Sequence, residues 1–184
     1  TYDSAMGFCV FNNIVIAARY ALQNYGLKRV AIVDFDVHHG NGTEQIVAGD
    51  QRIMLCSSFQ HPFYPHSGSP VSASNILSVP LDAGSTGEVF REKVQHWFDA
   101  LRNFQPELIL ISAGFDAHAE DPMAHLRLVE DDYFWVSEQL RIIADECCKG
   151  RVVSMLEGGY DLSALGRSVV AHLKGMSRPS SITP

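Results

Sequence analysis

Long hydrophobic runs are missing from this 184-residue sequence: Arg19 interrupts the longest candidate, so no segment reaches membrane-spanning length. A secretory signal peptide is not recognisable either. Cysteine is sparse, and the four residues, Cys9, Cys56, Cys147 and Cys148, lack the paired spacing of a zinc finger. We therefore expect reduced, mostly buried thiols and a cytoplasmic protein with no membrane partner.

Positive charge is also in short supply, because 14 Lys and Arg residues stand against 21 Asp and Glu residues, for a net charge of −7. This balance argues against direct binding to nucleic acid and mildly favours cationic partners. The length fits one domain, and the 46% hydrophobic and 19% charged residues are typical of globular proteins. We expect the domain to cover residues 1–175 and a disordered Ser/Pro tail to cover residues 176–184.

The stretch VAIVDFDVHHGNGT, residues 30–43, organises the rest of the sequence. Its β-branched apolar start predicts a buried strand, followed by Asp34, Asp36 and His38. In an extended chain, side chains two residues apart point the same way, so these three would converge on one side. Their burial is costly unless a cation compensates the charge, and oxygen plus nitrogen ligands fit zinc in an open, catalytic type of site. The alternative is a polar strand end with solvated side chains.

Apolar periodicity predicts helices alternating with strands along the whole chain. We expect helices over 8–25 (opened by Asn12 and Asn13), 43–48, 87–104, 130–149 and 162–173. We expect strands beginning at residue 30 and covering 52–56, 75–79, 107–112 and 151–156. A long loop over 59–74 is expected to be functional. This alternation predicts an α/β fold with a mostly parallel sheet covered on both faces, in which ligands bind at the carboxyl ends of the strands.

Further polar residues follow other predicted strands. Asp116 is the natural third metal ligand, which leaves one coordination position for water. A zinc ion in such a site acidifies its water and polarises a carbonyl group. Tyr160 follows a Gly-Gly pair and is suited to donate its hydroxyl to a tetrahedral oxyanion. A half-buried tyrosine with a structural hydrogen bond is the alternative.

Together, several motifs resemble the zinc-dependent histone deacetylase family, in the family's order and across almost the whole chain. They are GFCVFNN at 7–13, DFDVHHGNGT at 34–43, FYP at 63–65, GFDAH at 114–118 with DP at 121–122, and EGGY at 157–160. The GFDAH form is similar to class II and bacterial members, including acetylpolyamine amidohydrolases. The resemblance implies an arginase-like three-layer αβα fold.

The resemblance also implies roles for individual residues. Zinc would be bound by Asp36, His38 and Asp116, and Tyr160 would stabilise the oxyanion. A structural potassium ion beneath the site would be held by Asp34, Ser57 and the backbone carbonyls of Asp36, His38 and Ser58. The acyl-lysine tunnel would have Phe8 and Tyr64 at its walls and Gly159 near its floor.

Two departures from the family pattern affect what the resemblance implies. The family carries two adjacent histidines a few residues before the GFC motif, which act as general base and acid, whereas residues 1–6 contain no histidine. The family's N-terminal strands and rim loops would also be absent, so the chain would be the C-terminal, metal-bearing part of such a domain. In addition, His66 stands where many members have glycine.

The resulting hypothesis is a zinc-dependent amidohydrolase that removes acetyl groups from acetyl-lysine peptides or acetylpolyamines. Residues 1–184 alone would be nearly inactive without the histidine pair. The alternative from another class is a non-catalytic, metal-stabilised fragment or pseudoenzyme that acts as a binding module. Arginase-like hydrolysis with two manganese ions would need more carboxylate and histidine ligands than these segments contain.

Overall fold

The computed structural model describes residues 1–68 and 73–177. Within these residues, five parallel strands form one sheet in the order β3-β2-β1-β4-β5. The strands are β1 (Val30–Asp34), β2 (Ile53–Gln60), β3 (Ile76–Leu81), β4 (Leu108–Ala113) and β5 (Val152–Leu156). The all-parallel sheet confirms the predicted α/β class and places β1 at its centre.

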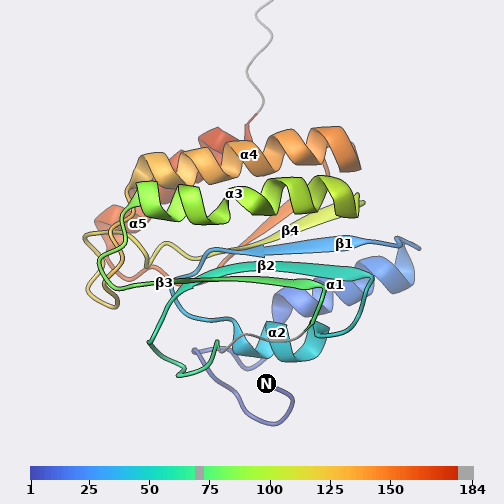
Figure 1. Cartoon of the computed structure of the whole chain (residues 1–184), viewed down its shortest axis with the longest axis horizontal. Helices are drawn as coiled ribbons and strands as arrows, with labels where there is room; N and C mark the ends of the chain where they lie inside the picture. The colour runs from blue at the N-terminus through green and yellow to red at the C-terminus, as the bar shows by residue number, and fades with distance from the viewer. Residues whose placement is uncertain (69–72, 178–184) are drawn as a thin grey trace, which may run out of the picture.

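Helices cover both faces of the sheet and complete three layers (Figure 1). On one face lie α1 (Asn13–Asn24) and α2 (Asn41–Val47), and on the other lie α3 (Gly87–Phe104), α4 (Glu130–Cys148) and α5 (Leu162–Met176). None of the helices in the described part of the chain has the length and hydropathy to cross a membrane.

The central strand explains how the two cores form. Ala31 and Val33 belong to the hydrophobic cluster that includes α3 and α4, whereas Val30 and Ile32 belong to the cluster that includes α1. Because successive strand side chains point to opposite faces, a strand covered on both sides is apolar along nearly its whole length. All five residues of β1 are accordingly buried, and the last of them is a carboxylate, Asp34.

Several element boundaries differ from the sequence-based expectations. The helix expected over 8–25 begins at Asn13, which confirms the predicted opening at Asn12 and Asn13: the Asn12 side chain caps the helix by accepting a hydrogen bond from the Val15 N–H at 3.1 Å. The strand expected over 52–56 continues to Gln60, since it pairs with β3 throughout this extension.

The ends of two other expected elements also differ from the prediction. Pro80 lies inside β3 rather than ending it, which is tolerated because β3 is an edge strand. Of the tail expected over 176–184, Met176 is the last residue of α5, and 178–184 lie outside the described residues.

A buried histidine links α5 to α4 and β5. The ring of His172 is only 3% exposed, with Nδ1 lying 2.6 Å from the Ser137 hydroxyl and Nε2 lying 2.9 Å from the Ser154 hydroxyl. Burial lowers the pKa of His172 from 6.5 to about 4. Between these values the unfolded chain binds a proton that the folded chain excludes, so the contribution of His172 to stability is fully present above pH 6.5 and is lost as the pH falls towards 4.

Between about pH 6.5 and 4, the free energy of unfolding of the wild type should fall as His172 becomes able to bind a proton only in the unfolded chain. We predict that this fall is about 3 kcal/mol smaller in the His172→Gln variant. Glutamine keeps hydrogen-bonding groups for both serines but does not titrate. Urea denaturation across this pH range measures the difference in slope. His96→Gln, on the exposed surface of α3, is the control and should keep the wild-type slope; an unchanged slope in the His172 variant would contradict the prediction.

Candidate metal centre

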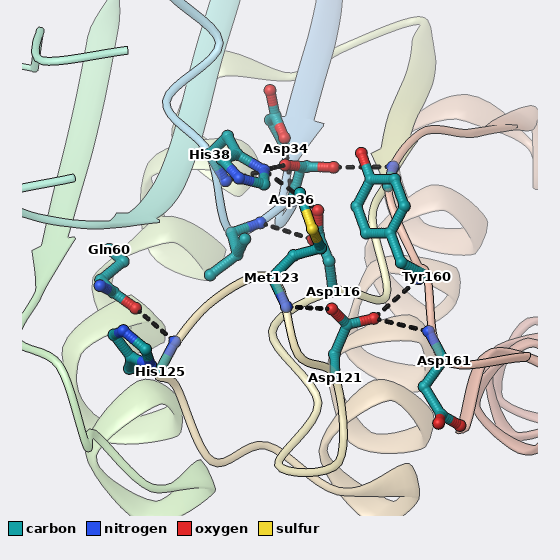
Figure 2. A network of polar contacts seen from close by, with 12 residues as sticks. Asp34, Asp36, His38, Gln60, Asp116, Asp121, Met123, His125, Tyr160 and Asp161 are labelled. Atoms are coloured by element: carbon teal, nitrogen blue, oxygen red, sulfur yellow. Dashed lines mark hydrogen bonds and ion pairs between the residues drawn. The ribbon is translucent and has the colours of Figure 1, made fainter. Parts of the chain in front are cut away.

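The three predicted metal ligands meet at the carboxyl end of the sheet. Asp36 and His38 follow β1, Asp116 follows β4, and β1 and β4 are neighbours in register, with Asp34 opposite Ser112. One ligand atom from each of the three side chains lies within 4.8 Å of the other two. Figure 2 shows the three converging from two separate loops. The structure therefore brings these three side chains together, and their role as metal ligands stays a prediction.

Asp116 is the most deeply buried member of the cluster, at 1% exposure. Its Oδ1 accepts a hydrogen bond from the Val37 N–H at 3.0 Å. Its Oδ2 accepts none from the described residues, although His38 Nδ1 lies 3.1 Å away without hydrogen-bond geometry. Burial, followed by the charge of Asp36, raises the pKa of Asp116 to about 6 despite the opposing effect of His38. A buried carboxylate oxygen without a donor is the position at which a cation is expected.

Asp36 and His38 form the more accessible side of the cluster. Oδ1 of Asp36 accepts the His38 N–H at 2.8 Å, and its Oδ2 accepts the Gly158 N–H at 2.8 Å. Burial opposes the charged form of His38, but the carboxylates of Asp116 and Asp36 outweigh it and raise its pKa to about 10. The imidazolium thus supplies the positive charge that the two carboxylates require, and a divalent cation bound to the same atoms would replace its proton.

Gly158 allows these groups to approach one another closely. A Cβ atom at this position would overlap Oδ2 of Asp116 and lie 2.7 Å from Oδ2 of Asp36. Any side chain here would therefore displace the cluster. Gly158 of the EGGY motif consequently supports the metal centre in two ways: it leaves room for the carboxylates, and its N–H donates a hydrogen bond to Asp36.

Asp34 does not join the cluster, which corrects the expectation that the residues spaced by two converge. The strand ends at Asp34, so Asp36 and His38 lie in the following loop and not on an extended strand face. Oδ1 of Asp34 accepts the Asp36 N–H at 3.1 Å. Burial and then the charge of Asp36 raise the pKa of Asp34 well above its usual range.

A second set of oxygen atoms lies beside Asp34. Ser57 is its register partner on β2, and the buried Ser57 hydroxyl has no hydrogen-bond partner among the described residues. Ser58 is likewise buried, at 3% exposure. Both serines lie within β2 rather than after it. A buried carboxylate beside an unpartnered hydroxyl fits the predicted monovalent cation site, and potassium there stays a prediction.

Tyr160 lies in the segment between β5 and α5, next to the cluster (Figure 2). Gly159 has a φ of +140°, which side-chain-bearing residues rarely adopt. Burial, and then the charges of Asp116 and Asp36, raise the pKa of Tyr160 to about 12. Its hydroxyl therefore stays protonated at neutral pH and remains able to donate a hydrogen bond.

The two predicted tunnel residues lie on the same side of the molecule as the cluster. The Phe8 ring is 6.3 Å from the Tyr160 ring, and the Tyr64 ring is 6.1 Å from the His38 ring, both edge to face. The Gly7 N–H donates a hydrogen bond to the Tyr64 hydroxyl at 3.3 Å, which ties the two loops together. The substrate-binding role of Phe8, Tyr64 and Gly159 stays a prediction.

Sequence reasoning missed three residues around the cluster. Phe63 stacks on His38 at 5.5 Å between ring centroids, Glu157 accepts a hydrogen bond from the Ser112 hydroxyl at 3.1 Å, and Asp121 binds the Tyr160 segment. Phe63 lies in the FYP motif, Glu157 in the EGGY motif and Asp121 in the DP motif. Their presence in these motifs could have pointed to them, although the sequence alone gave them no role.

Comparison with known proteins adds independent evidence. A family model described as the histone deacetylase domain matches residues 1–176. The chain is 44% identical over 174 residues to "Histone deacetylase 10, chloroplastic" of Oryza sativa, covering 91% of this chain and 39% of that protein. It is 38% identical over 185 residues to a "Probable deacetylase" of Methanothermobacter thermautotrophicus, covering 96% of this chain and 54% of that protein.

The chain belongs to the histone deacetylase family. Its structure also resembles the crystal structure of the HDA15 HD domain, with a TM-score of 0.84, 34% identity and coverage of 94% of this chain and 50% of that one. The chain thus spans about half or less of the length of these relatives.

We predict that the intact protein binds one zinc ion tightly and that Asp36→Ala and His38→Ala each abolish this binding. Each substitution removes a ligand and leaves too few donors for a tetrahedral site. Elemental analysis after gel filtration measures the metal content, with His96→Ala as a surface control. Stoichiometric zinc in the purified Asp36→Ala protein would contradict the ligand assignment.

Proposed function

We propose that this chain is the metal-bearing part of a zinc-dependent amidohydrolase that removes acetyl groups from acetyl-lysine peptides or acetylpolyamines. The observation that carries the proposal is the cluster of Asp36, His38 and Asp116 in a histone deacetylase domain. Two carboxylates and one imidazole leave a coordination position open, which is typical of catalytic zinc sites.

The donor set fits zinc in this structure. Asp116 presents a buried oxygen without a hydrogen bond, and the side chains of Asp36 and His38 are 14% and 21% exposed, so the cluster is reachable from solvent on one side. Zinc bound to these atoms would acidify a water molecule and polarise the carbonyl of an amide. Asp34 and Ser57 would hold a potassium ion.

The protein groups around the cluster support acyl transfer chemistry. Tyr160 would donate a hydrogen bond to the oxyanion that forms from the amide carbonyl, because it lies next to the cluster and a phenol is protonated at neutral pH. Phe8, Tyr64 and Gly159 would surround the acylated amine. The net charge of −7 favours the cationic peptides and polyamines from which such amines come.

A general base for this reaction is not supplied by the two histidines nearest to the ligand motifs. His39 is buried and contacts the Ser67 hydroxyl at 2.7 Å and the Glu44 carboxylate at 3.1 Å. His118 is 2% exposed, and its Nε2 lies 3.5 Å from Glu130. Neither belongs to the metal cluster. We infer that the base is supplied by protein outside these residues, as the family resemblance implies.

The second candidate function is a metal-stabilised module without catalysis, which fits the observation that neither His39 nor His118 belongs to the metal cluster. In that case the metal would compensate the buried carboxylates, and the protein would act through contacts alone. A histidine pair in the sequence that precedes Thr1 in the source gene would decide against this candidate.

We predict that Tyr160→Phe in the intact protein lowers kcat on an acetylated amine by about 10²–10³-fold. KM should change far less, because an oxyanion donor acts mainly in the transition state. Steady-state kinetics with an acetyl-lysine peptide and an acetylpolyamine provide the measurement. Equal changes in kcat and KM, or none, would assign Tyr160 a structural role.

We also predict that residues 1–184 expressed alone have at least about 10²-fold lower turnover per bound zinc than the full product of the source gene. General acid–base catalysis contributes about 10²–10⁴-fold, and these residues do not supply the expected base. Turnover is compared after normalising to zinc content. Equal turnover would place the base within these residues, and His39 and His118 would be the first positions to replace.

A further inference from the structure

The position of Tyr160 is set by a backbone segment that belongs to no helix or strand. Residues 157–161 connect β5 to α5, and Gly159 gives this segment a backbone conformation with little intrinsic preference. An oxyanion donor must be held to about 0.5 Å to be effective, so something outside the segment has to fix it. Among the contacts of the segment, one carboxylate binds the Tyr160 backbone itself.

That carboxylate belongs to Asp121, which lies in the loop after β4. Its Oδ2 accepts the N–H groups of both Tyr160, at 2.7 Å, and Asp161, at 3.0 Å. Its Oδ1 accepts the Met123 N–H at 2.9 Å, which fixes the carboxylate in its own loop. Figure 2 shows Asp121 bridging the two loops through these bonds.

The environment of Asp121 shows that these bonds satisfy the whole side chain. Asp121 is 6% exposed, and no ion pair in the described part of the chain involves it. Its charge is therefore balanced by three backbone N–H groups rather than by a lysine or arginine. Hydrogen bonds to a charged acceptor are stronger than those between neutral groups, so this arrangement resists displacement of the Tyr160 backbone.

We propose that Asp121 is a positioning residue that holds the Tyr160 backbone so that the phenol stands next to the metal cluster. The proposal rests on the proposed function, because it assigns Asp121 an effect on turnover through Tyr160. Gly158 is bonded to Asp36, so the segment is fixed at one end by a metal ligand and at Tyr160 and Asp161 by Asp121. The Asp161 side chain in turn accepts a hydrogen bond from the Ala164 N–H at 2.8 Å and so caps the start of α5. The segment is therefore also attached to this helix.

The test is a double-mutant cycle in the zinc-loaded intact protein with Asp121→Asn and Tyr160→Phe. Asparagine keeps the size of the side chain but replaces one acceptor oxygen by a donor, so at least one backbone N–H loses its partner. We expect Asp121→Asn to lower kcat about 10-fold or more with KM and zinc content nearly unchanged, and to have less than about a twofold effect when Tyr160 is already Phe.

Two neighbouring carboxyl groups provide matched controls. Glu120→Gln removes the same charge from the adjacent residue, whose side chain is exposed and pairs with Arg167 at 2.7 Å. Asp132→Asn alters another buried carboxylate that accepts a backbone N–H, from Val129 at 2.9 Å, at the start of α4. Both controls should keep kcat within about twofold of the wild type.

Unchanged kcat in Asp121→Asn, or an equal loss in both Tyr160 backgrounds, would overturn the role of Asp121. Hydrogen exchange of the wild type gives a second test that needs no variant: the amides of Tyr160 and Asp161 should be protected, and exchange as fast as in an unstructured peptide would overturn the proposal. An inactive wild type would contradict the proposed function alone, and the exchange measurement would then still decide whether the Asp121 bonds hold the segment.

Discussion

Excess negative charge at the carboxyl end of the sheet is the constraint on which the rest of this structure depends. Asp34, Asp36, Asp116 and Glu157 gather there, and burial is the main cause that raises the pKa of Asp34, Asp116 and Glu157. The protonated His38 is the one cationic side chain that contacts the group among the described residues. Such a concentration of buried carboxyl groups is stable only if the groups are protonated or compensated by cations, which gives a metal ion at this cluster a physical reason that is independent of family membership.

Much of the fold could be predicted because local sequence and tertiary packing agree. The helix over 87–104 was predicted with its observed bounds, since its apolar spacing is clear and Pro106 follows it. In the structure Gln105, with a φ of 54°, ends the helix. The predicted ends of helices and strands were wrong where tertiary contacts determine them. The inclusion of Pro80 in β3 depends on that strand being at the sheet edge, which spacing along the chain does not reveal.

The candidate site shows the same division between local and long-range information. The period of two drew attention to Asp36 and His38 correctly, yet it also included Asp34, because the sequence does not show that the chain leaves the extended conformation there. The bond between Asp121 and the Tyr160 N–H spans 39 residues and carries no local signal. Residue types that bind metals are readable from sequence, whereas the groups that hold a catalytic side chain in place require the structure.

Anomalous diffraction at the zinc edge, from crystals of the intact protein grown with no added metal, tests the central claim most directly. The account predicts one strong peak about 2.0–2.2 Å from Nδ1 of His38 and from carboxylate oxygens of Asp36 and Asp116. It also predicts no zinc peak beside Asp34 and Ser57, where the ligands are oxygens alone. A fully ordered cluster without a peak, with His38 hydrogen-bonded to the carboxylates instead, would contradict it.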